Sequence, residues 1–342
     1  MINKGTRMTA RIGINGFGRI GRSYLRAALL SNADIEVVAI NDIADAATLA
    51  SLLEWDSFSG HLAGVHVDGN TIVVNGARIR VTSEREPARI PWGDDNVDVV
   101  IESTGRFTGT ASARQHLAAG AQKVIISAPA DSDVPAIVLG VNDDAVDLAG
   151  NIFSNGSCTT NCLAPMAKVL HEAFGIESGL MTTIHAYTSD QRLQDAPHTD
   201  LRRARAAALS TIPTSSGAAS TIGRIIPELD GKLTGLSLRV PVPIGSITDL
   251  TAKLSRPVTA EEVNTAFRSA AAAPEMSTYL AYSEAPLVSA DIVGNPHSAI
   301  FDAPLTQVIG DQVKVFAWYD NEWGFSNRLV ELSQRIAESA QP

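Results

Sequence analysis

Residues 11–22 read RIGINGFGRIGR and decide the fold of the N-terminal half of the chain. They place Gly16, Gly18 and Gly21 in a GxGxxG spacing, after a short apolar strand pattern and at the start of a helical pattern. In such a unit the first glycine permits a tight turn, the second lets backbone approach a pyrophosphate, and the third allows helix and strand to pack closely. Free N–H groups at the helix start favour phosphate. The stretch therefore predicts a dinucleotide site.

An acidic residue follows at a suitable distance. Asp42 lies 21 residues after Gly21, at the end of the next predicted strand, 35–41. A carboxylate there accepts hydrogen bonds from the adenosine ribose hydroxyls and repels a 2′-phosphate, which favours NAD over NADP. Chance glycine turns also produce a GxGxxG spacing, and Asp42 could instead be a helix N-cap or a turn residue. The strand before the turn and the helix after it favour the cofactor interpretation.

Strand and helix patterns alternate outward from this unit. The order predicts an α/β Rossmann-type dinucleotide-binding domain, a parallel sheet covered by helices. Two further strands, 71–74 and 77–81, meet at Asn75–Gly76 and predict a hairpin added to the sheet. The predicted strands are 11–14, 35–41, 97–102 and 123–127, and the predicted helices are 19–30, 46–53 and 112–119.

The pattern changes after about Asn155. A helix at 159–174 is followed by long strand patterns without regular helical crossovers, at 179–185, 233–242 and 247–254. This predicts an α+β catalytic domain with a mainly antiparallel sheet. We expect the NAD-binding domain at 1–157, completed by a C-terminal helix at 322–342, and the catalytic domain at 158–321. The last helix pattern itself covers 327–340.

Composition narrows the class of protein. The 342 residues carry a formal net charge of −10, which disfavours nucleic acid or an anionic membrane as partner. No apolar run reaches the ~18 residues that a membrane span needs. The only cysteines, Cys158 and Cys162, are one helical turn apart and form no disulfide framework. We expect a cytoplasmic protein and no metal site.

One cysteine lies where a helix should begin. In SNGSCTTNC, residues 154–162, Cys158 comes directly before the predicted helix, whose dipole and free N–H groups favour a thiolate and so predict a lowered thiol pKa. His185 ends a strand pattern 27 residues later, and a returning strand could bring its imidazole beside the sulfur. A lone cysteine is more often a small buried apolar residue, which is how we interpret Cys162. A lone histidine at a strand end is likewise usually structural.

Several motifs together resemble one enzyme family. INGFGRIGR, ESTG, KVIISAP, SCTTNCLAP, TIHAYT, DLRRARAAA and WYDNEWGFSNR occur in this order between Arg11 and about Leu332. They resemble the phosphorylating glyceraldehyde-3-phosphate dehydrogenases. The resemblance implies that Cys158 attacks the aldehyde to form a thiohemiacetal and that His185 acts as general base. Hydride transfer to NAD would leave a thioester, and inorganic phosphate would release 1,3-bisphosphoglycerate from it.

The resemblance also implies binding residues. Further cofactor contacts would come from Arg19, Ile20, Arg85, Thr104, Ser127 and Asn321. The phosphate of the substrate would meet Thr188 and Arg239. The attacking phosphate would meet Ser157, Thr159, Arg205, Ser216 and Gly217. The polar segment 188–205 resembles the family's S-shaped loop at a subunit interface, which implies a homotetramer.

Two residues depart from the family pattern near the implied site. Gly156 stands where the family usually has alanine, and Ser216 where it commonly has threonine. They suggest an isoform that tolerates an electrophilic inhibitor of the cysteine. Two alternatives stay open: an erythrose-4-phosphate dehydrogenase with the same fold and cysteine–histidine pair, and a catalytically inert binding or regulatory homologue.

Overall fold

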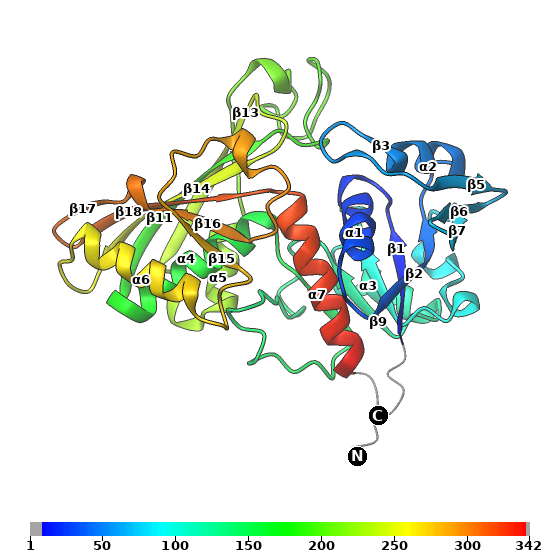
Figure 1. The fold of residues 1–342 in the computed structure, drawn as a ribbon, viewed down its shortest axis with the longest axis horizontal. Helices are drawn as coiled ribbons and strands as arrows, with labels where there is room; N and C mark the ends of the chain where they lie inside the picture. The colour runs from blue at the N-terminus through cyan, green and yellow to red at the C-terminus, as the bar shows by residue number, and fades with distance from the viewer. Residues whose placement is uncertain (1–8, 340–342) are drawn as a thin grey trace. The chain divides into compact units, whose positions relative to one another are not determined.

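The computed structural model describes residues 9–339. The tail ahead of the first strand and the expected end of the last helix at Ala340 lie outside these residues. Contacts divide the chain into two units, each described by itself (Figure 1). The N-terminal unit comprises 9–135, 146–155 and 326–339, and the C-terminal unit comprises 136–145 and 156–325. Among the described helices none is long and apolar enough to cross a membrane.

An eight-stranded sheet forms the centre of the N-terminal unit. Its order is β10-β9-β8-β1-β2-β7-β6-β5, and the strands from β10 to β7 run parallel. The predicted hairpin is confirmed: β6 and β7 pair antiparallel, and Asn75 and Gly76 both take the positive φ that a two-residue turn needs. The strands are β1 (Ala10–Asn15), β2 (Ile35–Asn41), β5 (Val65–Asp68), β6 (Thr71–Val74), β7 (Ala77–Thr82), β8 (Val99–Glu102), β9 (Lys123–Ile126) and β10 (Ile152–Ser154). A separate small hairpin joins β3 (Trp55–Asp56) to β4 (Gly60–His61).

Helices complete this unit. They are α1 (Arg19–Leu30), α2 (Ala46–Glu54), α3 (Thr110–Ala118) and most of α7 (Trp323–Ser339). The Tyr24 hydroxyl on α1 lies 3.0 Å from the Ser333 hydroxyl on α7, and both residues are buried. This contact binds the C-terminal helix to the first unit although more than three hundred residues separate the two positions.

The C-terminal unit holds a second eight-stranded sheet, ordered β12-β13-β11-β14-β18-β16-β15 with β17 paired to β18. It is mainly antiparallel, as predicted, with parallel pairs only at β11/β13 and β15/β16. The strands are β11 (Ile176–Ala186), β12 (Ile212–Ser215), β13 (Leu233–Val240), β14 (Ser246–Leu254), β15 (Leu280–Ser283), β16 (Ala299–Asp302), β17 (Gln307–Ile309) and β18 (Gln312–Tyr319). Its helices are α4 (Cys158–Phe174), α5 (Ala218–Ile225) and α6 (Ala260–Ala272).

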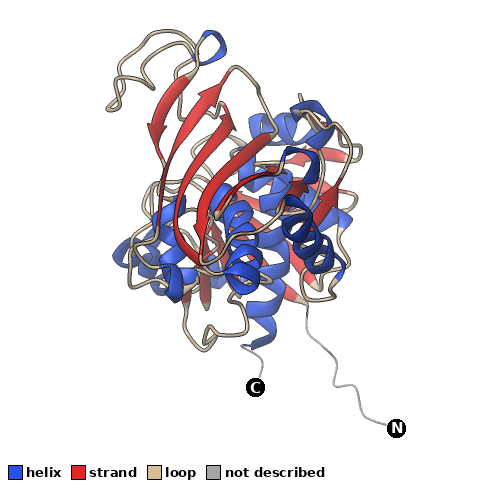
Figure 2. Cartoon of the chain, turned by 90° about the vertical axis from the view of Figure 1, so that its left-hand side faces the viewer, coloured by secondary structure: helices blue, strands red, loops and turns tan. Residues whose placement is uncertain are grey.

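The two faces of this sheet differ. Met181 on β11 is buried in the core that α4, α5 and α6 close. Leu180, on the opposite face of the same strand, is 66% exposed, and Leu236 on β13 is 43% exposed. Strand register places these two leucines on one face, because Leu180 pairs with Thr234 and Thr182 with Leu236. The long strands of this sheet can be followed in Figure 2.

Candidate active site

The turn after β1 has the geometry that a dinucleotide needs. Gly16 has φ +92°, and a Cβ there would lie 2.8 Å from the Thr104 backbone nitrogen. A Cβ at Gly21 would overlap the Gly16 carbonyl oxygen, whereas a Cβ at Gly18 would meet no atom within 4 Å. The backbone at Gly18 thus faces open space at the start of α1, where free N–H groups attract phosphate. These residues fit a bound NAD.

Asp42 lies directly after β2 and is tied to this turn. Its carboxylate accepts hydrogen bonds from the Phe17 N–H at 2.7 Å and from the Ala44 N–H at 3.0 Å. Asp45, not Asp42, is the N-cap of α2, accepting from the Thr48 N–H. Asp42 therefore holds its own turn and the glycine turn together, and each oxygen keeps a lone pair for a ribose hydroxyl.

We predict that Asp42→Ala raises the Kd of NAD about tenfold or more, because hydrogen bonds to a charged group contribute about 1.5–3 kcal/mol. The preference for NAD over NADP falls as well, since the charge that repels a 2′-phosphate is gone. Titration calorimetry with both nucleotides measures this. The control is Asp45→Ala, which removes a neighbouring cap, costs about 1 kcal/mol of stability and leaves the preference unchanged. An Asp42→Ala protein that binds both nucleotides as wild type does would disprove the role.

Other predicted cofactor residues lie at the same edge of the sheet. Thr104 and Ser127 follow the carboxyl ends of β8 and β9, the edge at which parallel sheets bind ligands. The Arg19 guanidinium forms an ion pair with Asp56 and lies over the Phe58 ring. Ile20 is half-buried in the first turn of α1, and Arg85 is exposed.

The C-terminal unit brings the predicted nucleophile and base together. Cys158 is the first residue of α4, with Ser157 as N-cap accepting from the Thr160 N–H. His185 lies near the end of β11, and its Nε2 is 3.4 Å from the Cys158 Sγ. Its Nδ1 lies 2.7 Å from the Ala186 carbonyl oxygen. When that carbonyl accepts the Nδ1–H, the lone pair of Nε2 points at the sulfur, as a base requires.

Arg239 on β13 supports the same pair. Its Nη1 donates to the Ala186 carbonyl at 3.0 Å and lies 2.8 Å from the His185 Nδ1. Because a guanidinium only donates, an Nη1–H aimed at Nδ1 would place the imidazole proton on Nε2. In the tautomer that suits a base, Arg239 and the Nδ1–H instead both donate to the Ala186 carbonyl. The arginine charge thus lies close to the imidazole and to the sulfur.

Burial acts against ionisation of either group alone. Burial of the sulfur raises the pKa of the Cys158 thiol, while the charge of Arg239 and the Thr159 N–H lower it by less. Burial, with the Arg239 charge, lowers the pKa of His185 to about 3. The predicted lowering of the thiol pKa is therefore wrong, because desolvation outweighs the helix start. Both shifts favour the uncharged forms, the thiol and the neutral imidazole.

Comparison with known proteins identifies the family of the chain. Two family models match: the NAD binding domain of glyceraldehyde 3-phosphate dehydrogenase at residues 10–110 and its C-terminal domain at 157–321. The glyceraldehyde-3-phosphate dehydrogenases of Mycobacterium avium and Mycobacterium tuberculosis (strain ATCC 25618 / H37Rv) are each 60% identical over 339 residues, covering 97% of this chain and 100% of theirs. Glyceraldehyde-3-phosphate dehydrogenase 2 of Streptomyces avermitilis is 60% identical over 329 residues, 95% of this chain and 98% of its own.

The chain belongs to the glyceraldehyde-3-phosphate dehydrogenase family. The predicted family, its fold and its enzymatic nature are confirmed, and the cofactor is NAD because the first matching model is the family's NAD-binding domain. Among residues 9–339 no cluster of histidine, cysteine or acidic side chains could hold a metal ion.

The phosphate residues implied by the glyceraldehyde-3-phosphate dehydrogenase resemblance are not all found together. Arg205 is exposed and pairs with Asp195 at the surface. Arg203, which the resemblance did not single out, is partly buried, forms an ion pair with Asp190 and donates to the Thr214 hydroxyl at 2.8 Å. Burial lowers the pKa of Arg239, and the nearby charge of Arg203 adds to that lowering. A partly buried arginine beside a second one is the better candidate for a dianion.

The remaining implied residues differ in which of their hydrogen-bonding groups already have a partner within the protein. The Thr159 hydroxyl is buried against the Tyr319 hydroxyl at 2.9 Å, and the Thr188 N–H donates to the Gln191 side chain. The Ser216 hydroxyl accepts a hydrogen bond from the Ala218 N–H, and Gly217 is exposed directly before α5.

Asn321, the residue implied for the nicotinamide, is buried. Its Oδ1 accepts hydrogen bonds from the Gly245 N–H and the Ser246 hydroxyl, so the N–H groups of its amide are the ones that could bind a ligand.

Sequence reasoning also missed Tyr319, the last residue of β18. Its ring meets His185 edge-on with centroids 5.9 Å apart, and its hydroxyl lies 2.7 Å from the Thr183 hydroxyl. Burial raises the pKa of Tyr319, so the phenol stays neutral, and its ring holds the imidazole in place by packing against it. Tyr319 lies two residues before Asn321 in the motif WYDNE, which is the signal that could have indicated it.

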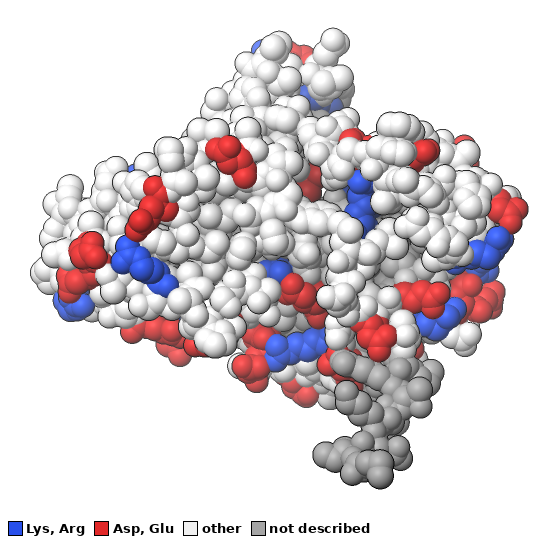
Figure 3. All heavy atoms as spheres, viewed as in Figure 1, with Lys and Arg blue, Asp and Glu red and all other residues white. Residues whose placement is uncertain are grey.

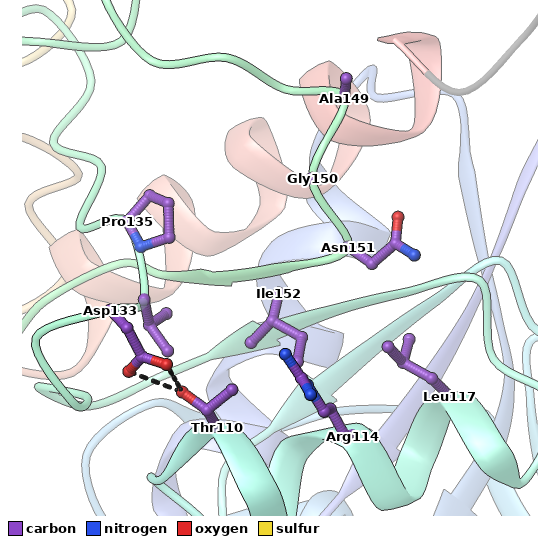
Figure 4. Close-up of a pocket in the computed structure, with 10 residues that line it drawn as sticks. Thr110, Arg114, Leu117, Asp133, Pro135, Ala149, Gly150, Asn151 and Ile152 are labelled. Atoms are coloured by element: carbon purple, nitrogen blue, oxygen red, sulfur yellow. Dashed lines mark hydrogen bonds between the residues drawn. The ribbon is translucent and has the colours of Figure 1, made fainter.

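The N-terminal unit also contains a hollow of about 700 Å³ between α3 and the segment before β10 (Figure 4). The Thr110 hydroxyl there hydrogen-bonds to the Asp133 carboxylate, and Arg114 is exposed. None of the residues predicted for NAD binding or catalysis in this glyceraldehyde-3-phosphate dehydrogenase homologue lines it.

Proposed function

We propose that the protein oxidises D-glyceraldehyde 3-phosphate with NAD and inorganic phosphate to 1,3-bisphosphoglycerate. The observation that carries this is the 3.4 Å contact between the Cys158 Sγ and the His185 Nε2 at the start of α4. A thiol paired with an imidazole is a device for covalent catalysis at a carbonyl carbon. Family membership supplies the substrate class.

Each covalent step uses this pair. As the Cys158 sulfur adds to the aldehyde carbon, its proton passes to Nε2 of His185 and on to the new hydroxyl, giving a thiohemiacetal. Bound NAD supplies the hydride acceptor for the carbon–hydrogen bond. His185 then takes the hydroxyl proton, and a thioester to Cys158 results. A phosphate oxygen attacks this carbonyl, and the carbon–sulfur bond breaks while the proton on His185 returns to the departing sulfur. The acyl phosphate then leaves, with the thiol and the neutral imidazole restored.

Positive charge near the sulfur supports an anionic substrate. Arg239 lies beside His185, and Arg203 lies near Arg239. We assign the two phosphate groups of the reaction to these arginines and to the hydroxyl and N–H donors of Thr188, Ser157 and the 216–217 turn. Asn321 would hold the nicotinamide carboxamide through its free amide hydrogens.

Steady-state kinetics with purified protein tests the proposal. We expect NADH formation from glyceraldehyde 3-phosphate that depends on added phosphate. Faster turnover of erythrose 4-phosphate would favour the alternative dehydrogenase. A protein that reduces NAD with neither aldehyde, with or without added phosphate, would be the inert homologue.

We also propose a homotetramer in the cytoplasm. Both thiols are free, which suits a reducing compartment. The exposed leucines Leu180 and Leu236 share the uncovered face of the second sheet, and an apolar sheet face is a natural contact for another copy. On the face drawn in Figure 3, Lys and Arg occur in small groups among Asp and Glu rather than in one basic area. Sedimentation equilibrium giving a monomer mass would refute the assembly.

A last proposal concerns inhibitor tolerance. Gly156, two residues before Cys158, has φ +64°, and a Cβ there would lie 3.2 Å from the Thr160 methyl carbon. Alanine at this position would be strained and would press on the first turn of α4, which also carries the sulfur. We predict that Gly156→Ala with Ser216→Thr is inactivated several-fold faster by a thiol-directed epoxide than wild type. Iodoacetamide, a smaller reagent, serves as control, and equal epoxide rates would refute the proposal.

A further inference from the structure

Three strands of the N-terminal unit end in a row of buried polar side chains. Asn15, Asn41 and Glu102 are the last residues of β1, β2 and β8 and are between 1% and 3% exposed. Strand register places Asn15 opposite both of the others. The Asn41 amide donates to the Asn15 side-chain oxygen at 2.8 Å, and the Asn15 amide donates to Glu102 Oε2 at 2.6 Å. The row spans three neighbouring strands at the edge where the cofactor loops begin.

Each member of the row is followed by a loop predicted to hold NAD. Gly16 and Gly18 follow Asn15, Asp42 follows Asn41, and Thr104 follows Glu102. The Glu102 Oε1 accepts from the Thr104 N–H at 2.8 Å and from the Thr104 hydroxyl. Asn41 also holds the loop after β7. Its side-chain amide donates to the Glu84 carbonyl and its side-chain oxygen accepts from the Glu84 N–H, and Arg85 is the next residue.

A second pair of side chains, His116 and Trp92, holds the Glu102 carboxylate in place. His116 on α3 is 0% exposed, and its Nε2 lies 3.1 Å from Glu102 Oε2. The Trp92 indole N–H donates to the other ring nitrogen, Nδ1, at 3.0 Å. An indole N–H can only donate, so Nδ1 must accept and Nε2 must carry the proton that goes to Glu102. The tryptophan thereby selects the one tautomer that holds the carboxylate.

All four hydrogen bonds to Glu102 are therefore donated to it. Asn15 and His116 donate to Oε2, and the Thr104 N–H and hydroxyl donate to Oε1. A buried carboxylate with four donors is rigid, because moving it would leave a charge unpaired away from water. Such a group fixes the distance between the glycine turn and Thr104, whose backbone leaves no room for a Cβ on Gly16.

We infer that Glu102, held by His116 and Trp92, is a positioning residue for the NAD site. It contacts no reacting atom. It keeps the cofactor loops in their binding geometry before NAD arrives, so that binding does not have to order them. The inference rests on the NAD contacts proposed above.

The test compares binding with catalysis in the full-length protein. Glu102→Gln turns one acceptor oxygen into a donor facing other donors, and His116→Leu removes the donor to Oε2. We expect both to raise the Kd of NAD in calorimetric titration about tenfold or more, since each breaks buried bonds to a charge. At saturating NAD, kcat and the rate of Cys158 alkylation should stay close to wild type. His116→Gln should restore wild-type affinity, because an amide offers both a donor and an acceptor.

The matched control is Lys123→Met. Lys123 is buried in the same unit, its ammonium donates to the Leu148 and Gly150 carbonyls, and it begins β9 at the end away from the cofactor loops. We expect the Lys123→Met variant to have a lower melting temperature and an unchanged Kd of NAD. If Glu102→Gln does not fold, Trp92→Phe keeps most of the ring and removes only the indole donor, with a smaller rise in Kd expected.

The outcomes separate two failures. If Asp42→Ala weakens NAD binding while Glu102→Gln, His116→Leu and Trp92→Phe do not, the positioning role is wrong and the cofactor site stands. If Asp42→Ala also has no effect, the proposed cofactor site itself is wrong. An equal loss of affinity in Lys123→Met would show a general effect of instability and would overturn the inference.

Discussion

We expect Cys158→Ser to lower kcat for glyceraldehyde 3-phosphate by at least about a thousandfold, because a serine hydroxyl is a far weaker nucleophile than a thiol and forms no thioester. The fold should survive, since the serine oxygen fits the space of the sulfur beside His185. Initial rates of NADH formation at saturating NAD and phosphate measure the effect. Mass spectrometry after iodoacetamide should show that the label of the wild type is gone.

Cys162 supplies the control. It lies one turn further along α4, is 0% exposed and has its thiol 3.6 Å from the Ala317 carbonyl oxygen. Burial raises the pKa of Cys162 to about 12, so its thiol stays protonated. We expect Cys162→Ala to lower stability by the loss of a buried side chain and to leave kcat within about a factor of two. A Cys158→Ser protein with a tenth of wild-type activity would contradict the covalent mechanism.

His185→Asn should lower kcat about a hundredfold to ten-thousandfold, the range over which a general base contributes. The amide cannot take the Cys158 proton or the thiohemiacetal proton. The alkylation rate of Cys158 at pH 7 should fall too, because burial already raises its pKa and the neighbouring base is then absent. His66→Asn, a change at an exposed histidine on β5, is the control. An unchanged alkylation rate would show that the imidazole does not assist the sulfur.

The same variant changes how stability depends on pH. Burial lowers the pKa of His185 to about 3 in the folded protein, below its ordinary value of about 6.5 in the unfolded chain. Its contribution to stability is therefore full above about pH 6.5 and is lost as the pH falls toward 3, since the unfolded state binds the proton first. Urea unfolding at pH 7 and pH 5 should show a larger loss for wild type than for His185→Asn. Equal losses would mean that His185 is not buried as described.

Some features followed from local spacing and needed no tertiary information. The glycine turn, the hairpin at Asn75–Gly76 and the helix starting beside Cys158 were all predicted within a residue or two. Helix α6 is not among the predicted helices, although Thr259 and Glu262 form a capping box at its start, a pattern visible in the sequence. These features depend on backbone conformations that a few neighbouring residues impose, so a short stretch is enough to reveal them.

Other features depend on which strands become neighbours. Glu102 contacts Asn15, which lies 87 residues away in the sequence, and Tyr319 contacts Thr159, which lies 160 residues away. No local sequence pattern therefore predicts either contact. Arg203 rather than Arg205 approaches Arg239 because of how one long loop folds back. The direction of the Cys158 pKa likewise follows from burial, which sequence spacing does not report.

Family, the fold classes of the two parts, the dinucleotide turn and a candidate nucleophile and base could all be predicted from the residues alone. The burial that shifts the pKa of both groups, the arginine beside them and the hydrogen bonds between the cofactor loops emerge only from the tertiary structure. The physical reason is that turns and helix starts are short-range properties of the backbone. Desolvation and hydrogen-bond geometry are set by all the atoms that long-range packing brings around a group.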